Sequence, residues 1–253
     1  MAGGALEGRL ILVTRPQREA GSLAERLRQE GAEPIEAPTI EILPPRDAGP
    51  VDRALREVAR GEFEWVVFTS PRAVEAVVAR LVVLGLETAI PAKVAAVGEK
   101  TADTLRDLDI QVDLVPKVYT TETLAEAFPA GSGRVLLPRA DIAPDGLEEG
   151  LSAGGWTPVR VDAYETRFPS ELPPEALRAI ENDRLDAIAF TSASTVEGFA
   201  RVAVAPSGAK VVCIGPVTAE AARRAGLEVD RVASPHTLEG LVHALRLAFE
   251  REK

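Results

Sequence analysis

Small polar and basic residues recur in this chain just after short apolar runs and just before segments of helical period. A turn of this kind offers free backbone N–H groups, a partial positive charge and often a hydroxyl, which together favour a carboxylate or phosphate. Each one alone is more often a plain helix N-cap, but their repetition predicts a ligand with many acidic groups. The turns are Thr14-Arg15, Thr69-Ser70, Gly98-Glu99-Lys100-Thr101, Pro138-Arg139, Thr191-Ser192-Ala193-Ser194 and Gly215-Pro216-Val217-Thr218.

Signatures of other chemistries are missing from the sequence. It has neither a Gly-x-Gly-x-x-Gly fingerprint nor a Walker loop, and no Ser-His-Asp order or paired acids for glycoside hydrolysis. The single cysteine, Cys213, lies in Val-Val-Cys-Ile-Gly and is expected to be a buried small hydrophobe. Two histidines, His236 and His243, are too few for a zinc site. We therefore expect a binding site with few reactive side chains and no metal.

Composition limits the class of protein and its partners. The chain has 253 residues, of which 46% are hydrophobic and 27% charged, and this balance predicts packed domains. A net charge of −10 without a basic cluster argues against nucleic acid or an anionic membrane as partner. Neither a membrane-spanning apolar run nor a secretory signal is recognisable, so the expected location is cytoplasmic.

Internal repeats give the domain organisation. Three ungapped pairs of segments occur in the order A, B, A, B, a period too long for a solenoid, which predicts two similar domains. The pairs are Leu10–Ile42 with Arg134–Thr166, Glu64–Val78 with Asp186–Ala200, and Lys93–Val115 with Lys210–Val232.

Apolar runs alternate with helical segments, which indicates parallel α/β sheets. Helices are expected over Glu19–Glu30, Thr101–Leu108 and Thr218–Ala225. The expected strands are Leu10–Thr14, Trp65–Thr69, Val94–Val97, Val112–Val115, Val135–Pro138, Ala187–Thr191, Val211–Ile214 and Val229–Val232.

Two segments, Pro34–Pro44 and Pro158–Phe168, have an extended pattern and are long for single strands. About eleven extended residues reach roughly 35 Å, enough to pass from one domain to another. We therefore favour an interleaved arrangement, in which the first A block joins the last B block. A tandem arrangement split near Gly131 is the alternative. In either case each sheet takes two strands from an A block and three from a B block.

Several motifs together resemble the uroporphyrinogen-III synthase family over essentially the whole chain. They are the opening LILVTRP, then FTSPRAV, the paired VGEKTA and IGPVTA turns, VDAYET, and the late FTSAST with SPHTLEGL. The resemblance rests on the order and spacing of these motifs, since none is diagnostic alone.

The resemblance implies two flavodoxin-like, doubly wound α/β domains interleaved in sequence and joined by a two-stranded connector. Residues 1–36 and 167–253 would form the first domain and residues 44–158 the second, with 37–43 and 159–166 as the connector. It also implies the reaction, in which linear hydroxymethylbilane closes to uroporphyrinogen III in a cleft between the domains. Loss of the terminal hydroxyl, attack by ring D and a spiro intermediate would invert that ring, without a cofactor.

The resemblance also implies roles for individual residues. Tyr164 would assist departure of the hydroxyl as the catalytic residue, although it is also consistent with a strand tyrosine whose tip is wet. Its counterpart in the first A block is Ile40. Val217 stands where the family often has a second threonine, so that contact would be supplied by backbone or omitted. The expected substrate contacts are Arg15, Thr69, Ser70, Gly98, Lys100, Thr101, Arg139, Ser192, Ser194, Val217 and Thr218.

Arg15 and Arg139 are the candidates for direct pairing with substrate acids, and a solvated arginine at a helix start is the alternative. As partner we expect the polycarboxylate tetrapyrrole, with the chain acting as a monomer that meets the preceding pathway enzyme transiently. A solute-binding protein or a regulatory sensor of the same fold are the competing classes. Turnover of hydroxymethylbilane to the type III isomer separates all three.

Overall fold

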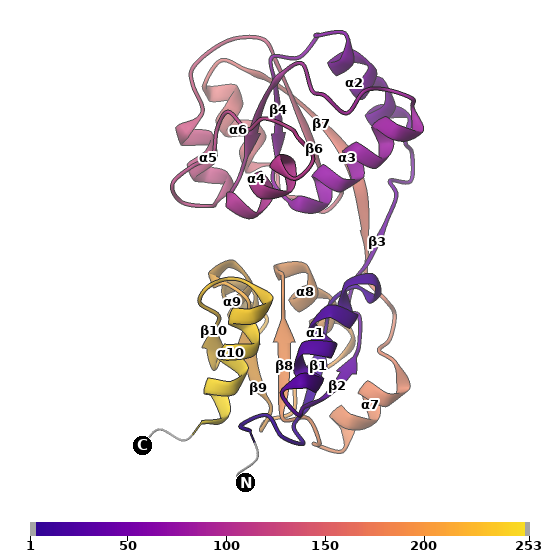
Figure 1. Cartoon of the computed structure of the whole chain (residues 1–253), viewed down its shortest axis with the longest axis vertical. Helices are drawn as coiled ribbons and strands as arrows, with labels where there is room; N and C mark the ends of the chain where they lie inside the picture. The colour runs from indigo at the N-terminus through magenta and orange to yellow at the C-terminus, as the bar shows by residue number, and fades with distance from the viewer. Residues whose placement is uncertain (1–3, 251–253) are drawn as a thin grey trace. The chain divides into compact units, whose positions relative to one another are not determined.

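The structure is a computed structural model that describes residues 4–250. The chain forms two compact units (Figure 1). Unit 1 runs to Glu41 and resumes at Arg167, and unit 2 spans Ile42–Thr166. No helix in the described part of the chain is long and apolar enough to span a membrane.

Unit 1 contains a five-stranded sheet in the order β10-β9-β8-β1-β2, and the strand pairs with a recorded register are parallel. Successive residues of β1 alternate between the faces, so Ile11 and Val13 pack on one side and Leu12 on the other. The strands are β1 (Leu10–Val13), β2 (Glu33–Glu36), β8 (Ala187–Phe190), β9 (Lys210–Cys213) and β10 (Arg231–Val232).

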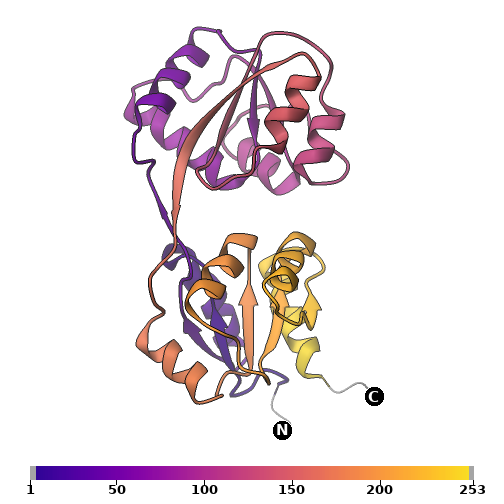
Figure 2. The ribbon, with the colours of Figure 1, turned by 180° about the vertical axis from the view of Figure 1, so that it is seen from behind.

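Helices cover both faces of this sheet. One core lies beneath α1 (Gln17–Gln29) and α10 (Leu238–Phe249). The other lies beneath α7 (Pro174–Glu181), α8 (Ala193–Val202) and α9 (Pro216–Arg224), which face the reader when unit 1 is seen from behind (Figure 2). The near-continuous apolar strands of the sequence follow from this double cover.

Unit 2 repeats the design with a sheet in the order β3-β7-β6-β4-β5. Helices α2, α3 and α4 pack on one face, and α5 and α6 on the other. The strands are β3 (Glu41–Leu43), β4 (Trp65–Phe68), β5 (Lys93–Ala96), β6 (Arg134–Ala140) and β7 (Thr157–Arg167). The helices are α2 (Gly49–Ala59), α3 (Pro71–Val83), α4 (Glu99–Arg106), α5 (Thr121–Ala127) and α6 (Gly146–Ala153).

The sheet orders confirm the interleaved arrangement and overturn the tandem alternative. β1 lies in the same sheet as β9, and β6 lies in the same sheet as β5. Unit 1 takes two strands from the first A block and three from the last B block, as predicted. The predicted fold class, two doubly wound parallel sheets interleaved in sequence, is therefore confirmed.

The predicted strand over Val112–Val115 is wrong. In the described part of the chain, this segment forms a single bridge between Ala95 and Leu114, and unit 2 takes β3 as its fifth strand instead. The reason lies one residue further on. Ala233 in unit 1 donates its N–H to the Cys213 carbonyl at 2.8 Å, whereas its repeat counterpart, Pro116, has no N–H to donate.

The two extended segments differ from each other. The second is one strand, β7. The first is broken into β2 and β3, which belong to different sheets. Between them Thr39 is fully buried, and its Oγ1 lies 2.7 Å from the Thr195 carbonyl and 3.2 Å from the Thr14 carbonyl. These contacts hold the chain to unit 1 before it leaves, so the extended pattern over 34–44 corresponds to two short strands with a tethered segment between them.

Candidate functional site

Four helix starts in the two units form two repeat-related pairs. The serines Ser70 and Ser192 are the N-caps of α3 and α8, and the glycines Gly98 and Gly215 are the N-caps of α4 and α9. Each follows the carboxyl end of a parallel strand, where ligands bind in open α/β sheets. Of these four helix starts, each unit by itself contributes one capped by serine and one capped by glycine.

The serine caps use their side chains to bind their own helices. Ser70 Oγ accepts the Ala73 N–H at 3.2 Å, and Ser192 Oγ accepts the Thr195 N–H at 3.3 Å. Ser192 Oγ also lies 3.0 Å from Ser194 Oγ. These hydroxyls stiffen the turns, so the remaining first-turn N–H groups are held in place for a ligand.

The glycine caps are in extended conformation, with φ of −171° at Gly98 and −168° at Gly215. Glycine is required at position 98 because of the space available rather than the backbone angle, since a Cβ there would lie 2.9 Å from Tyr119 Cβ. At Gly215 a Cβ would lie 3.6 Å from His236 Cγ, an ordinary contact. Because the helices begin at these glycines, they start two residues before the predicted threonines.

Tyr119 and His236 were missed as candidates from the sequence. Extending the second B-block alignment by four residues would have placed them opposite each other. Tyr119 is 54% exposed beside Gly98. His236 is exposed, and its Nδ1 lies 2.8 Å from the Ala233 carbonyl, so the Nδ1–H donates.

The predicted hydroxyl contacts at the glycine caps are buried. Thr101 and Thr218 are 3% and 4% exposed and stand third in their helices, whereas Val217 is 63% exposed. Lys100 is exposed on the same first turn as Thr101. Both turns therefore present backbone N–H groups, and the turn at Gly98 also presents Lys100. The side chains of Thr101 and Thr218 are buried.

The repeat-related arginines have different environments. Arg15 is half-buried at the end of β1. Arg139 is only 2% exposed, and its Nη1 donates to the Pro144 carbonyl at 2.7 Å and to Glu148 Oε2 at 2.8 Å. A guanidinium turned into unit 2 and paired there has no surface for a substrate acid. We therefore infer that Arg139 supports unit 2, which makes its predicted role in pairing with substrate acids less favourable than that of Arg15.

Tyr164 lies at an irregularity of the unit 2 sheet. Along β6 and β7, Arg139 is opposite Asp162 but Ala140 is opposite Tyr164, so Ala163 is an extra residue. A bulge of this kind re-aims side chains and is frequent beside active sites. Tyr164 is 9% exposed, and its hydroxyl lies 3.4 Å from Ser70 Oγ. The bulge thus brings the predicted catalytic residue to the capped start of α3.

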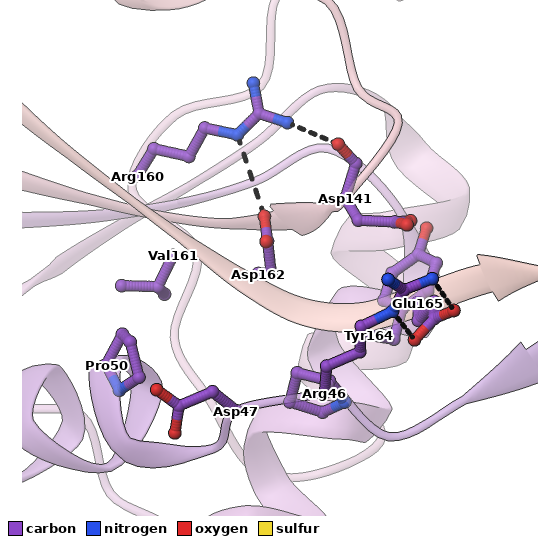
Figure 3. A pocket seen from close by; sticks show the side chains of 10 residues that line it. Arg46, Asp47, Pro50, Asp141, Arg160, Val161, Asp162, Tyr164 and Glu165 are labelled. Atoms are coloured by element: carbon purple, nitrogen blue, oxygen red, sulfur yellow. Dashed lines mark hydrogen bonds and ion pairs between the residues drawn. The ribbon is translucent and has the colours of Figure 1, made fainter.

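A pocket of about 450 Å³ in unit 2 borders Tyr164 (Figure 3). Two of its lining residues, Arg46 and Glu165, form a two-pronged ion pair with both N···O distances 3.0 Å. Glu165 raises the pKa of Arg46 by hydrogen bonding and by its charge. The lining residues are Pro45, Arg46, Asp47, Pro50, Asp141, Arg160, Val161, Asp162, Tyr164 and Glu165.

The charges in this pocket exclude it as an anion site. Its four carboxylates outnumber the guanidinium groups of Arg46 and Arg160. Asp141 Oδ1 accepts the Thr166 N–H at 2.8 Å, and Arg160 donates to the Asp141 carbonyl at 3.0 Å, so these polar groups brace the end of β7. These contacts therefore support the end of β7 that carries Tyr164.

Other candidate chemistry is not found among residues 4–250. No group of three or more potential ligands there could hold a metal ion. Cys213 is fully buried, and burial raises the pKa of its thiol to about 12, so it is protonated at neutral pH. The interpretation of Cys213 as a buried small hydrophobe is confirmed.

Comparisons with known proteins point to one family. The family model described as uroporphyrinogen-III synthase HemD matches residues 21–243. The uroporphyrinogen-III synthase of Synechococcus elongatus is 34% identical over 97% of this chain and 97% of its own. A porphyrin biosynthesis protein HemD of Ruminiclostridium josui is also 34% identical, over 95% of this chain and 48% of its own length.

A solved structure shares the fold. A mutant uroporphyrinogen III synthase of Thermus thermophilus matches with a TM-score of 0.73 at 23% identity, covering 97% of this chain and all of that one. This likeness supports the architecture, and the sequence matches support the kinship. Because the family model spans most of the chain and the 34% identity runs the length of both proteins, this chain belongs to the uroporphyrinogen-III synthase family.

Proposed function

We propose that the chain closes linear hydroxymethylbilane to uroporphyrinogen III with inversion of ring D, and that Tyr164 assists loss of the terminal hydroxyl. The observation that carries the role of Tyr164 is its place beside the bulge, with its hydroxyl 3.4 Å from the N-cap of α3. There a phenol can donate to a leaving group held by the neighbouring helix start.

The helix starts bind the substrate carboxylates. In unit 2 the groups are those of Thr69, Ser70, Gly98, Lys100 and Thr101. In unit 1 they are Arg15 and the turns with Ser192, Ser194, Val217 and Thr218. An overall charge of −10 does not prevent this, because salt screens distant charges while the N–H groups act at contact distance. At Thr101, Val217 and Thr218 the contact is made by backbone, since the two threonine side chains are buried.

The proposed reaction needs few reactive side chains from the protein. The C–O bond to the terminal hydroxyl breaks, and with a proton donated by Tyr164 the hydroxyl leaves as water. The resulting azafulvene is attacked by the substituted carbon of ring D, and the spiro intermediate fragments and closes again with that ring inverted. The final closure releases one proton, which restores the Tyr164 phenol. Holding the two ends of the bilane together supplies most of the acceleration. We propose no cofactor for these steps.

The test is turnover of hydroxymethylbilane by the purified chain, with oxidised products separated as type I and type III isomers. The type I isomer forms without the enzyme, so the proposal requires type III product above the blank. Type I product alone would contradict it and favour a binding protein or sensor.

We also propose that the chain acts as a monomer and meets the preceding pathway enzyme only transiently. The support for the transient contact is chemical. Hydroxymethylbilane closes spontaneously to the type I isomer, so rapid transfer from the preceding enzyme to this chain would limit that loss. Light scattering of the purified chain, alone and mixed with that enzyme, tests both parts. A stable dimer or a stable complex would contradict them.

A further inference from the structure

We propose that Ser70 is a positioning residue for Tyr164, and that its hydroxyl directs the phenolic proton of Tyr164 towards the substrate. The inference rests on the proposed role of Tyr164. It changes the role of the Ser70 side chain, because its one hydroxyl proton goes to Tyr164, and leaves the substrate contact proposed above for Ser70 to its backbone.

Both side chains are held by rigid elements of unit 2. Ser70 caps α3 with extended backbone angles, φ −159° and ψ 152°, and its Oγ accepts the Ala73 N–H. Tyr164 is 9% exposed and packs in the core formed with α2, α3 and α4. Their 3.4 Å separation exceeds the usual ~2.8 Å for hydroxyl groups. Catalytic contacts are often long before substrate binds and tighten afterwards.

The count of protons and lone pairs permits either direction of the Ser70–Tyr164 bond, but only one direction assists the reaction. The Ser70 hydroxyl has one proton and two lone pairs, and one lone pair receives the Ala73 N–H. If Ser70 donates to the Tyr164 oxygen, the phenolic proton is left for the departing hydroxyl. The donated bond also stabilises the negative charge that grows on the tyrosine oxygen during proton transfer.

The repeat shows why this pairing is confined to unit 2. Ser192 is the counterpart of Ser70, but its Oγ lies 3.0 Å from Ser194 Oγ on its own helix. Arg72 stands at the position equivalent to Ser194, and Ile40 stands at the position equivalent to Tyr164. The two serines therefore share the same capping geometry but differ in their second partner, which is the Tyr164 phenol for Ser70 and the Ser194 hydroxyl for Ser192.

The repeat also supplies the control for a double-mutant cycle. Ser70→Gly removes the hydroxyl, and glycine at an N-cap costs only a few tenths of a kcal/mol compared with serine. Gly98 is an N-cap of this kind in the same unit. Ser192→Gly makes the same change in unit 1, whose sequence contains no tyrosine. Ser70→Thr keeps a hydroxyl and is the rescue variant.

Each serine variant is made with Tyr164 intact and with Tyr164→Phe, and kcat for type III product is measured. We expect Ser70→Gly to lower kcat about fivefold when Tyr164 is intact, with little change in KM, and less than about twofold in the Tyr164→Phe background. Ser192→Gly should cost the same on both backgrounds, and Ser70→Thr should recover most of the rate.

The outcomes separate this inference from the proposed function. Wild-type rates for Tyr164→Phe would overturn the role of Tyr164 itself. An impaired Tyr164→Phe, together with an equal Ser70→Gly loss on both backgrounds, would overturn the positioning role alone. So would a loss for Ser192→Gly that also depends on Tyr164, because the coupling would then be a general effect of the fold.

Discussion

The carbonyl oxygen of Thr39 lies against Gly198 so closely that a Cβ on Gly198 would be 1.9 Å from it. Gly198 is in α8, and Thr39 is in the segment between β2 and β3. Thr39 Oγ1 also donates to the Thr195 carbonyl at 2.7 Å, so the segment lies along the first turns of α8. The chain therefore leaves unit 1 across α8 at a position where the helix has no room for a side chain.

Gly198→Ala is accordingly expected to destabilise unit 1 by about 3 kcal/mol, because backbone must move to admit the methyl group. Gly21→Ala is the matched control, since Gly21 lies in α1 with nothing within 4 Å of its added Cβ. That change should stabilise the helix by about 0.5–1 kcal/mol. Hydrogen exchange of unit 1 amides measures both, and a neutral Gly198→Ala would contradict the contact.

Tyr164→Phe is expected to lower kcat for type III product at least ~10-fold, or about 1.4 kcal/mol of transition-state stabilisation, because it removes one hydroxyl from the ring. Ser192→Ala and Thr218→Ala should cost less, since backbone N–H groups remain at both turns. Single-turnover assays that separate the isomers give the numbers. Near-complete loss in Ser192→Ala with full activity in Tyr164→Phe would place the hydroxyl chemistry at the serine turn.

Arg139 and Arg15 should respond differently to removal of charge. Arg139→Met leaves Glu148 without its buried partner and is expected to destabilise unit 2 by about 2–3 kcal/mol. Adding Glu148→Met should restore much of the loss. Arg15→Met should instead raise KM.

The fluorescence of Trp65 and Trp156 can report the unfolding of unit 2 in the arginine variants, because both tryptophans of the chain are in unit 2. Unfolding in urea monitored at these residues gives the stability of unit 2. A raised KM in Arg139→Met with unchanged unfolding would reinstate Arg139 as a substrate contact.

Asp52 and Arg80 join α2 to α3 through two N···O contacts of 2.5 and 2.6 Å. Arg80, chiefly by hydrogen bonding, lowers the pKa of Asp52 below its ordinary value. For a carboxyl with a lowered folded-state pKa, the stabilisation is present above the unfolded-state pKa and is lost as the pH falls through the folded-state pKa. Asp52→Asn should therefore destabilise unit 2 at pH 7, and the difference from wild type should vanish in acid.

Urea unfolding followed by tryptophan fluorescence from neutral to acid pH measures this difference. Asp103→Asn is the control, because the Asp103–Arg106 ion pair is exposed and such pairs contribute little. A constant difference at every pH would show that Asp52 acts through packing rather than charge.

Interleaving could be predicted from the sequence because it depends on long-range features, a repeat and two overlong extended segments. Local details of the fold and of the site could not be predicted as well from the sequence. Pro116 is visible in the sequence, but its effect on the ladder depends on where the neighbouring strand ends. The pairing of Arg139 with Glu148 depends on the approach of α6, and the meeting of Tyr164 with Ser70 depends on one extra residue at Ala163. Neither periodicity nor repeats carries that information.

Interleaving also sets an order on the synthesis of the protein. β1 lies between β2 and β8, yet all of unit 2 leaves the ribosome between β2 and β8. At ~5–20 residues per second this delay is on the order of ten seconds. We expect the continuous unit 2 to fold first, while β1 and β2 remain an open apolar edge available to chaperones. Protease treatment of nascent chains stalled before β8 should then yield a protected unit 2 and a digested N-terminal segment.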